Sequence, residues 1–266
     1  ILACDRLGEG RMVDPLLIEL AIQNVIIQKK SNGTLKRDLS GKKIITTAGP
    51  TLESLDLARL ITNRSSGKMG VLISQAAKFR GAKVELIHGP LTVPKPWLEG
   101  LYSEQIKSAE DMREALQNKQ SSANALVMAA AVADLRRIKG AQSIKPSKAN
   151  LLANLESSFE AVPDLLKELV EKRPKGQILL GFAAIAGTNQ EIQEAGKVKK
   201  DQKGCDLIFA NPIDRANQGF GSDSNGGFLL GPGDQIRSIP ATSKLFLAHK
   251  LLDAIQEVST DSYELN

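Results

Sequence analysis

The fold is decided by two neighbouring segments, Ile44-Ile45-Thr46-Thr47-Ala48-Gly49-Pro50-Thr51 and Asn63-Arg64-Ser65-Ser66-Gly67-Lys68-Met69-Gly70. The first passes from β-branched apolar residues to small residues and proline, which predicts a buried strand that ends in a tight turn. The second passes from small polar residues, glycine and lysine into an apolar segment, which predicts the beginning of a helix. A strand, a turn and a helix start in this order are typical of an α/β protein.

The helix expected over residues 67–80 has a helix start suited to an anion. Ser65 or Ser66 is its expected N-cap, and Gly81 is its expected stop. Its apolar residues share one face: Met69, Leu72, Ile73 and Ala76. Free backbone N–H groups, two hydroxyls and a lysine at a helix N-terminus favour binding of a phosphate. An ordinary capped helix after a loop explains the same residues equally well.

Strands and helices alternate along the rest of the chain. We expect strands over 43–48, 83–88, 125–130, 177–182 and 206–210, and further helices over 109–117, 163–172 and 189–203. Residues 228–230 and 235–238 predict an antiparallel hairpin, and residues 245–255 an amphipathic helix. Nearly all-apolar strands that alternate with helices predict an α/β fold, a Rossmann-like, mostly parallel sheet with helices on both faces. Ligands of such sheets bind beyond the carboxyl ends of the strands.

Two further segments lack periodicity. Residues 136–154 mix lysine, glycine, serine and proline, which predicts a mobile basic loop, either a solvated flap or a lid over phosphates. Residues 217–226 predict a long turn. The isolated His88 and His249 are interpreted as structural.

The composition bounds the partners and the compartment. The net charge is +5, aromatic residues make up 4% of the chain, and Cys4 and Cys205 are the two cysteines. A basic balance suits anionic partners, but few aromatics and no dense Lys/Arg stripe argue against nucleic acid. No stretch has the roughly twenty apolar residues of a membrane span, so no membrane partner is expected. Two cysteines make no disulfide framework and no metal cluster, which favours a reducing, cytoplasmic location.

The strand end and helix start around residues 44–70 also show a family resemblance. Residues 45–53, Asp56, Arg59 and residues 61–70 closely resemble phosphopantothenoylcysteine synthetase. This family is the C-terminal ligase half of the bifunctional bacterial decarboxylase/synthetase of coenzyme A biosynthesis. The resemblance is long and ungapped, which makes it far more specific than a glycine motif. It assigns residues 39–258 to a ligase domain and residues 259–266 to a frayed tail.

Residues 1–38 resemble a different part of that bifunctional protein. Ala3-Cys4, Gly8–Met12 and Asp14-Pro15 are similar to the end of its flavin-dependent decarboxylase, although Asp5 replaces a usual glycine. The rest of that domain is not in the sequence, so we expect neither FMN nor decarboxylase activity from this chain. A short helix over 15–28 and a polar linker over 29–34 are expected to lead into the ligase domain.

The resemblance implies a reaction in two halves. The family activates the carboxylate of 4′-phosphopantothenate with CTP, which forms an acyl-cytidylate and releases pyrophosphate. The amine of L-cysteine then attacks the acyl carbon, which forms 4′-phosphopantothenoylcysteine and releases CMP. The multiply charged substrates explain why Mg²⁺, lysines and helix N-termini are expected in the site. The resemblance also implies a homodimer, and a full-length protein with an N-terminal decarboxylase domain.

The resemblance first indicates which residues are expected to contact the acyl substrate. Asn63 matches the asparagine of the second half-reaction, and its alternative is a plain loop asparagine. Arg59 matches a family arginine, and its alternative is a surface salt bridge. The other expected substrate contacts are Ser65, Ser66 and Gly67, which would receive the phosphate, and Ala130 and Ala131 at a strand end.

The nucleotide residues are spread more widely over the chain. The CTP-binding set that the resemblance implies is Gly49, Asp134, Pro163, Asp164, Phe182, Lys199 and Lys203, with metal ligands left unassigned. Each has a structural alternative: a helix N-cap for Asp134, a core residue for Phe182 and a solvated helix face for the two lysines. Four residues apart, Lys199 and Lys203 are expected to project from one face of a helix.

The chain departs from the family at several positions. Ser143 stands at the place of a lysine that helps to form the intermediate, so Lys145 is the expected catalytic replacement. Val162 and Ile185 replace an asparagine and a glutamate. These departures keep open a catalytically weak nucleotide-binding module or scaffold. An NAD(P)-binding oxidoreductase lacks support because no Gly-x-Gly-x-x-Gly follows the first strand, and a P-loop because no Ser or Thr follows Lys68.

Overall fold

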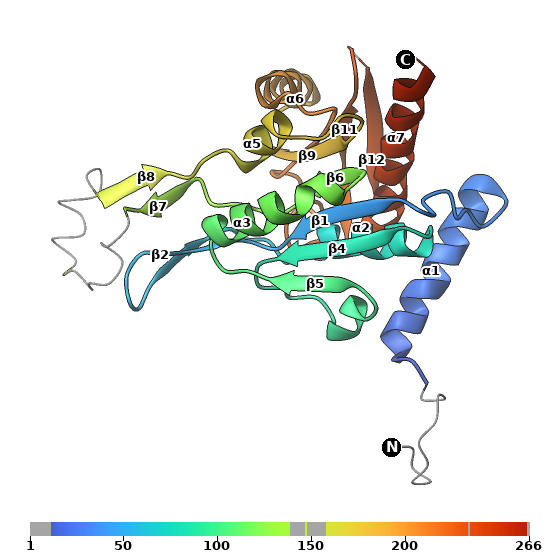
Figure 1. Cartoon of the computed structure of the whole chain (residues 1–266), viewed down its shortest axis with the longest axis horizontal. Helices are drawn as coiled ribbons and strands as arrows, with labels where there is room; N and C mark the ends of the chain where they lie inside the picture. Colours follow the sequence, from blue (N-terminus) through green and yellow to red (C-terminus); the bar gives the residue numbers. More distant parts are fainter. Residues whose placement is uncertain (1–11, 139–146, 148–157, 234, 265–266) are drawn as a thin grey trace, which may run out of the picture.

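The computed structural model describes residues 12–138, 147, 158–233 and 235–264. One eight-stranded sheet runs through it in the order β12-β11-β10-β9-β6-β1-β4-β5 (Figure 1). The strands are β1 (Lys43–Ala48), β4 (Lys83–His88), β5 (Tyr102–Gln105), β6 (Ala125–Met128), β9 (Ile178–Ile185), β10 (Leu207–Pro212), β11 (Ser224–Leu230) and β12 (Ile236–Ser243). The pairs from β5 to β10 are parallel, and β10–β11 and β11–β12 are antiparallel. The predicted α/β class, with its mostly parallel sheet and its hairpin, is confirmed.

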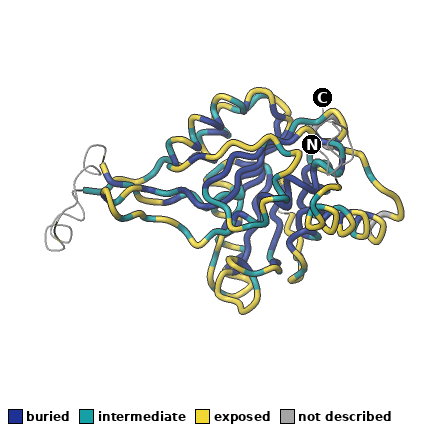
Figure 2. Tube along the Cα trace, turned by 90° about the horizontal axis from the view of Figure 1, so that it is seen from below, coloured by how far each residue is buried: buried dark blue, intermediate teal, exposed yellow. Residues whose placement is uncertain are grey.

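Alternation along the strands fills two cores, one on each face of the sheet. Ile44 of β1 packs into one core, and its neighbour Ile45 packs into the other. Successive side chains of a strand point to opposite faces, so a strand that is apolar at every position needs helices on both sides. In Figure 2 the buried residues gather along these central strands.

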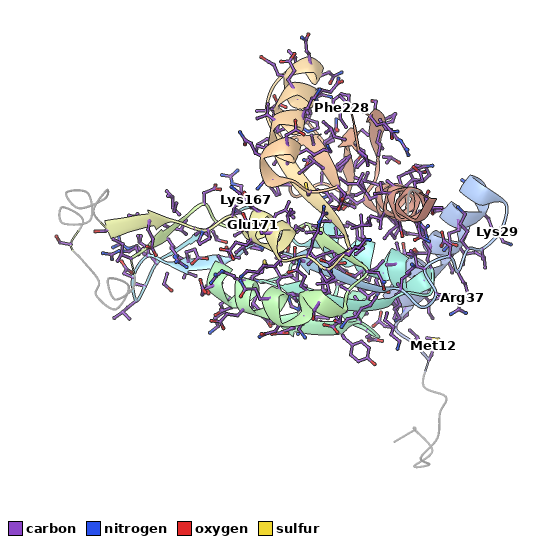
Figure 3. The ribbon with its side chains drawn as sticks, turned by 45° about the horizontal axis from the view of Figure 1, so that its top comes forward. Met12, Lys29, Arg37, Lys167, Glu171 and Phe228 are labelled. Carbon is purple, nitrogen blue, oxygen red and sulfur yellow. The ribbon has the colours of Figure 1, made fainter. Side chains whose placement is uncertain are left out.

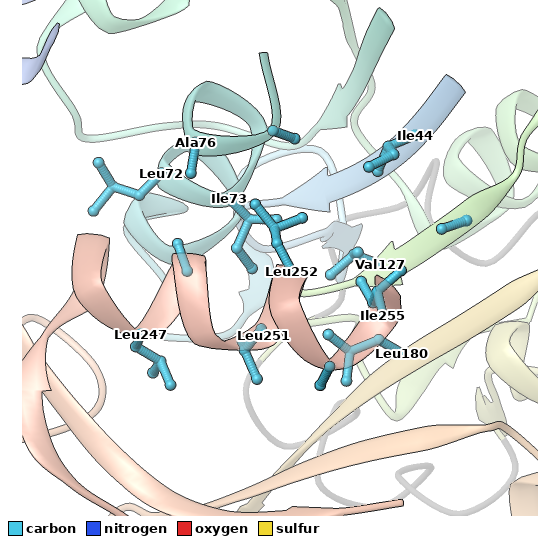
Figure 4. Close-up of a cluster of buried hydrophobic side chains, with 14 of the residues drawn as sticks. Ile44, Leu72, Ile73, Ala76, Val127, Leu180, Leu247, Leu251, Leu252 and Ile255 are labelled. Atoms are coloured by element: carbon cyan, nitrogen blue, oxygen red, sulfur yellow. The ribbon is translucent and has the colours of Figure 1, made fainter. Parts of the chain in front are cut away.

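Helices α2 (Lys68–Phe79) and α7 (Lys244–Glu264) cover the first face, and α1 (Pro15–Asn32) packs beside them. Figure 4 shows the resulting core, where Ile73 of α2 and Leu252 of α7 meet above Val127 of β6. Helices α3 (Ala109–Lys119), α5 (Leu165–Glu171) and α6 (Asn189–Lys203) cover the second face. Two short 3-10 turns, η1 (Lys95–Leu98) and η2 (Gln120–Ser122), complete the helical elements of the described residues.

Four three-residue strands form an extension that we call the arm. β2 (Leu52–Ser54) pairs with β3 (Leu60–Thr62), and β7 (Leu135–Arg137) pairs with β8 (Phe159–Ala161). The Arg137 guanidinium donates to the Leu55 carbonyl oxygen at 2.9 Å and thereby joins the two hairpins. Figure 1 shows the arm reaching away from the sheet beyond the carboxyl ends of the parallel strands.

Several boundaries differ from the sequence predictions. Helix α1 continues through the predicted linker to Asn32 because Asp14 caps its start and Gly33, at φ 70°, ends it. Residues 224–226 lie in β11 rather than in the long turn, and α7 runs through Glu264, past position 258. The first residues of the predicted loop at 136–154 lie in β7, whereas 139–146 and 148–154 lie outside the described residues. β5 and the four strands of the arm were not predicted.

Candidate functional site

A cleft of about 650 Å³ opens at the carboxyl ends of β1, β6, β9 and β10. It is lined by residues from helix starts, strand ends and the loop before β11. This is the position at which open parallel sheets bind their ligands. Figure 3 shows α5, with Lys167 and Glu171 labelled, between the arm and α6, and the first residues of α5 line the cleft.

Most of the predicted site residues line this one cleft. The predicted site residues among its lining are Asn63, Ser65, Ser66, Gly67, Ala130, Ala131, Asp134, Pro163, Asp164, Phe182, Lys199 and Lys203. They come from segments far apart in the sequence, so the fold brings the predicted acyl-substrate residues and the predicted nucleotide residues together. Gly49 and Arg59 are not among the lining residues, and Lys145 lies outside the described residues.

Gly49 and Arg59 have local roles in this chain. Gly49, at φ 74°, accepts from the Ala131 backbone N–H at 2.9 Å and lies directly behind Gly67. Arg59 lies in the β2–β3 turn, where its Nε donates to Asp56 Oδ2 at 2.8 Å. This pairing lowers the pKa of Asp56. Within the single chain, Arg59 therefore has the salt bridge that was the alternative to a substrate contact.

The start of α2 forms one wall of the cleft. The N-cap is Gly67 in the left-handed region, at φ 76°, and not Ser65 or Ser66 as predicted. The two serine hydroxyls accept from the N–H groups of Gly67 and Lys68 at 3.3 Å, the long end of the hydrogen-bond range. A helix start held this loosely keeps its N–H groups and its positive dipole end available to an anion.

A close approach of α2 to β1 fixes this helix start against the sheet. A Cβ on Gly70 would lie 2.3 Å from the Thr47 carbonyl oxygen and 2.7 Å from the Ala48 Cβ. Such distances are far inside van der Waals contact, so only glycine fits here without a shift of the helix. The tight crossing places the α2 N-terminus at the end of β1.

The alanine-rich end of β6 forms the floor of the cleft. The Ala130 and Ala133 N–H groups donate to the hydroxyls of Thr47 at 3.0 Å and Thr51 at 2.9 Å. Asn63 donates from its single amide nitrogen to the carbonyl oxygens of Ala131 at 3.2 Å and Val132 at 3.0 Å. Both partners are acceptors, so the amide orientation is determined and Asn63 can offer a ligand its acceptor oxygen.

Lys199 and Lys203 define what we call the α6 end of the cleft. Both are half-buried on one face of α6, as the four-residue spacing predicted. Lys203 Nζ lies 2.7 Å from Asp164 Oδ2, and Asp164 also caps α5 by accepting from the Lys167 N–H. Burial alone would raise the pKa of Asp164, but the Lys203 hydrogen bond and the capping bond outweigh it and hold that pKa below its usual value.

Asp134 and Phe182 also line the cleft. Asp134 is exposed and precedes strand β7, so its alternative as a helix N-cap is wrong. Phe182 is half-buried, with its ring 5.6 Å from that of Phe209 in an edge-on arrangement. One part of the ring thus packs against the core while the residue also lines the cleft.

The opposite side, which we call the α2/α7 end, contains the lysine of the predicted anion-binding helix start, Lys68, and residues that the sequence analysis did not assign to a site. Lys68 and Lys244, the first residues of α2 and α7, both line the cleft, together with Asn211 and Asn225. In the sequence, Lys244 indicates only the beginning of the last helix. Its burial, at 5% exposure, is a tertiary property that no local pattern signals.

The sequence over residues 39–258 matches the family of the DNA/pantothenate metabolism flavoprotein C-terminal domain. The chain belongs to this family. The resemblance of its motifs is thereby confirmed, and a similar fold is found in a crystal structure of the C-terminal domain of coenzyme A biosynthesis bifunctional protein CoaBC. That structure is 32% identical, has a TM-score of 0.67, and the match covers 84% of this chain and 100% of the other.

Longer relatives of this flavoprotein C-terminal domain family are also found. Coenzyme A biosynthesis bifunctional protein CoaBC of Bacillus subtilis (strain 168) is 36% identical over 264 residues, which cover 99% of this chain and 62% of the relative. The protein of the same name from Vibrio cholerae is 35% identical over 259 residues, which cover 96% of this chain and 60% of the relative. The chain thus spans less than two thirds of the length of these curated relatives.

Two negative observations apply to the described part of the chain. No helix in it combines the length and the apolar character that a membrane crossing requires. No cluster of three or more His, Cys, Asp or Glu side chains in it is arranged to hold a metal ion.

Proposed function

We propose that this chain ligates 4′-phosphopantothenate to L-cysteine with CTP, through an acyl-cytidylate, in coenzyme A biosynthesis. Membership of the flavoprotein C-terminal domain family and the names of the CoaBC relatives support this assignment. A cytoplasmic location and a homodimer belong to the same proposal, as does a decarboxylase domain in the full-length protein.

The observation that carries the proposal is the position of Asn63. Its side chain joins the segment before α2 to the end of β6, and it lines the same cleft as residues of both predicted substrate sets. A residue that acts on an intermediate made from two substrates has to be within reach of both, and a shared cleft supports that role for Asn63.

In the first half-reaction the cleft has to bring a carboxylate against the α-phosphate of CTP. Phosphate oxygens would be stabilised by the α2 N-terminus and by Lys199 and Lys203, which surround the cleft with positive charge. Asp134 is placed to orient a polar group of the nucleotide. Holding the two reactants in one cleft replaces a bimolecular encounter by a positioned reaction.

Mg²⁺ fits this site as a companion of the nucleotide. The described residues offer exposed carboxylates such as Asp134 but no preformed group of three ligands. Mg²⁺ commonly binds one or two carboxylates together with substrate phosphates and water, so such a site suffices. When bound, the ion would neutralise phosphate charge.

In the second half-reaction the amine of cysteine attacks the acyl carbon and CMP leaves. Because both donors of the Asn63 amide are engaged with the Ala131 and Val132 carbonyls, its oxygen is the group available to accept from the amine. This oxygen would then position the nucleophile rather than donate to the acyl carbonyl.

The alternative is a nucleotide-binding module that performs no ligation. Val162, which replaces the family asparagine, lines the cleft, and Lys145 lies outside the described residues. The lysine position concerns activation of the carboxylate. A module of this kind would bind CTP but release no pyrophosphate.

The deciding experiment follows pyrophosphate and the amide product separately. The chain is incubated with CTP, Mg²⁺ and 4′-phosphopantothenate, and L-cysteine is then added. We expect pyrophosphate only when CTP and phosphopantothenate are both present, and amide only after cysteine. Pantothenate without its phosphate serves as the matched control substrate. CTP binding without pyrophosphate release would replace the ligase by the module.

A further inference from the structure

The α2/α7 end of the cleft has a positive charge that its own carboxylates do not balance. Lys68 begins α2 and Lys244 begins α7, and both line the cleft. The N-terminus of each helix adds a further partial positive charge at the same place. This end is therefore built around cations.

Lys244 is the more unusual of the two lysines. It is 5% exposed, and its ammonium group donates to the Gly219 carbonyl oxygen at 2.8 Å. Among the described residues it makes no salt bridge, so its charge is buried without a carboxylate in contact. Burial, with the added repulsion of Lys68, lowers its pKa, and Asp223 opposes this only in part. A buried, uncompensated ammonium group is costly unless something pairs with it.

Asp223 is the carboxylate at this end, and it is held loosely. Its side chain forms an ion pair with Lys68 while remaining 90% exposed to solvent. Its backbone carbonyl accepts from the Lys244 N–H at 3.0 Å, so the residue lies against both lysines. An ion pair this exposed contributes little free energy and is readily exchanged.

We propose that Lys68 and Lys244 form a phosphate-binding site at the α2/α7 end of the cleft, and that Asp223 is the counter-ion that the phosphate displaces. The site rests on the proposed function for the identity of its ligand, but its chemistry does not depend on ligation. A phosphate offers several strong acceptor oxygens and can pair with both ammonium groups at once, whereas the single carboxylate of Asp223 contacts Lys68.

The exchange of the Asp223 carboxylate for a phosphate is favourable in free energy for the cleft as a whole. The incoming phosphate brings two or more negative charges where Asp223 brought one, and it reaches the buried ammonium of Lys244. Lys68 exchanges one anionic partner for another, and the freed Asp223 carboxylate returns to water, where it is already mostly exposed. Phosphate binding also stabilises the charged form of Lys244, so the protein takes up protons on binding at alkaline pH.

Two groups of the proposed substrates share this chemistry: the polyphosphate of CTP and the phosphate monoester of 4′-phosphopantothenate. Matched pairs of ligands distinguish them. If Lys244→Met weakens binding of CTP but not of CMP, the site holds the outer phosphates of the nucleotide. If it weakens binding of phosphopantothenate while leaving pantothenate unchanged, the site holds the monoester.

The test measures pyrophosphate binding by titration calorimetry, without turnover. We expect Lys244→Met to weaken binding by about tenfold or more, the loss expected for a charge-assisted hydrogen bond. Lys250→Met is its control, because Lys250 lies on the same helix and stacks on Phe246 outside the cleft. Asp223→Asn should tighten binding about two- to fivefold, since it removes an exposed competitor. Asp201→Asn, which alters an exposed pair with Lys200, is the control for that change.

The outcomes separate the site from the ligase. Unchanged pyrophosphate affinity in both Lys244→Met and Asp223→Asn overturns the site, whether or not the chain is active. Variant-dependent binding in a chain that makes no product overturns the ligase alone. If Lys244→Met does not fold, Lys68→Met and Asp223→Asn decide the matter, because neither side chain is buried in the core: Lys68 lines the cleft and Asp223 is exposed to solvent.

Discussion

The two ends of the cleft carry lysines in opposite electrostatic situations. At the α6 end, Lys203 is paired with Asp164 at 2.7 Å, and that carboxylate is also tied to the start of α5. At the α2/α7 end, Lys244 is buried against a carbonyl oxygen, and the carboxylate of Asp223 is paired with Lys68 in solvent. The carboxylate at the α6 end is fixed by the fold, whereas the carboxylate at the α2/α7 end is exposed and the buried lysine has none in contact.

The difference indicates a division of labour within one cleft. A lysine fixed by a structural carboxylate is positioned to orient a ligand, but much of its charge is already compensated. A lysine without such a partner can contribute its charge to an anion that arrives later. We therefore expect the α6 end to select the ligand and the α2/α7 end to supply the affinity for phosphate.

The largest effect is expected at Asn63, which lines the same cleft as the lysines of both ends. Asn63→Asp would set a carboxylate against the Ala131 and Val132 carbonyls and remove the two donated hydrogen bonds. We expect amide formation to fall by about 100-fold or more, since a repelled side chain no longer positions the amine. Pyrophosphate release should continue. Single-turnover kinetics with and without cysteine measure the two steps, and an unchanged amide yield would remove Asn63 from the mechanism.

The next largest effect concerns the crossing that positions the α2/α7 end. Gly70→Ala places a Cβ at 2.3 Å from the Thr47 oxygen, so α2 has to move away from β1. We expect a loss of about 1–3 kcal/mol in the free energy of unfolding, measured by urea denaturation. Pyrophosphate binding should weaken with it. Gly231→Ala is the control, because its Cβ would meet nothing closer than 3.7 Å.

At the α6 end, the ion pair of Lys203 with Asp164 can be broken from either side. If Lys203 binds the nucleotide, the two substitutions should change the KM for CTP differently. Lys203→Met should raise the KM for CTP by about tenfold, the effect of one charged hydrogen bond. Asp164→Asn should leave KM unchanged or lower it, because Lys203 is released. Steady-state kinetics at saturating phosphopantothenate separate these cases. Equal increases in KM for both variants would mean that the pair only holds α5 against α6.

The smallest effect is a pH dependence in α7, the helix that begins at Lys244. The Nε2–H of His249 donates to Asn24 Oδ1 at 2.9 Å. Burial, with the nearby Arg80, lowers the pKa of His249 from 6.5 to about 4, against the opposing charges of Asp253 and Asp38. A lowered folded-state pKa means that the unfolded chain binds the proton first below pH 6.5. Stability is therefore complete above that pH and is lost as pH falls toward 4.

We expect a loss of about 1 kcal/mol between neutral pH and about pH 5.5 from this histidine alone. Thermal melts of the protein and of His249→Gln measure it. The variant should show a shallower pH dependence over this range. Equal slopes for the two proteins would assign the acid sensitivity to other groups.

The sequence was sufficient wherever a pattern is local. The α6 boundaries are those predicted from Asn189 to Lys203, because a Thr188 capping box and Gly204 mark both ends in the sequence itself. The convergence of Lys199 and Lys203 on a cleft at the strand ends follows from helix periodicity and sheet topology. For the same reason the class of the sheet was predictable.

What depends on tertiary contact could not be predicted in this way. The burial of Lys244 results from the loop that presents Gly219, and the ion pair of Lys68 with Asp223 joins residues far apart in the chain. The three-residue strands of the arm are too short for a period-2 pattern to be recognised. At the α2 start, a serine is the usual cap, but the approach to Gly49 requires Gly67 in that position.

The threonines of β1 and its turn bear on how substitutions in this family should be judged. Thr47 and Thr51 are fully buried, and in composition they resemble any β-branched strand residue. Their hydroxyls, however, are the acceptors that fix the Ala130 and Ala133 N–H groups in the floor of the cleft. A scoring scheme that treats threonine and valine as equivalent in buried strands would rank Thr47→Val and Thr51→Val as harmless. In this protein those two replacements would preserve the shape of the core and release the backbone that forms the floor of the cleft.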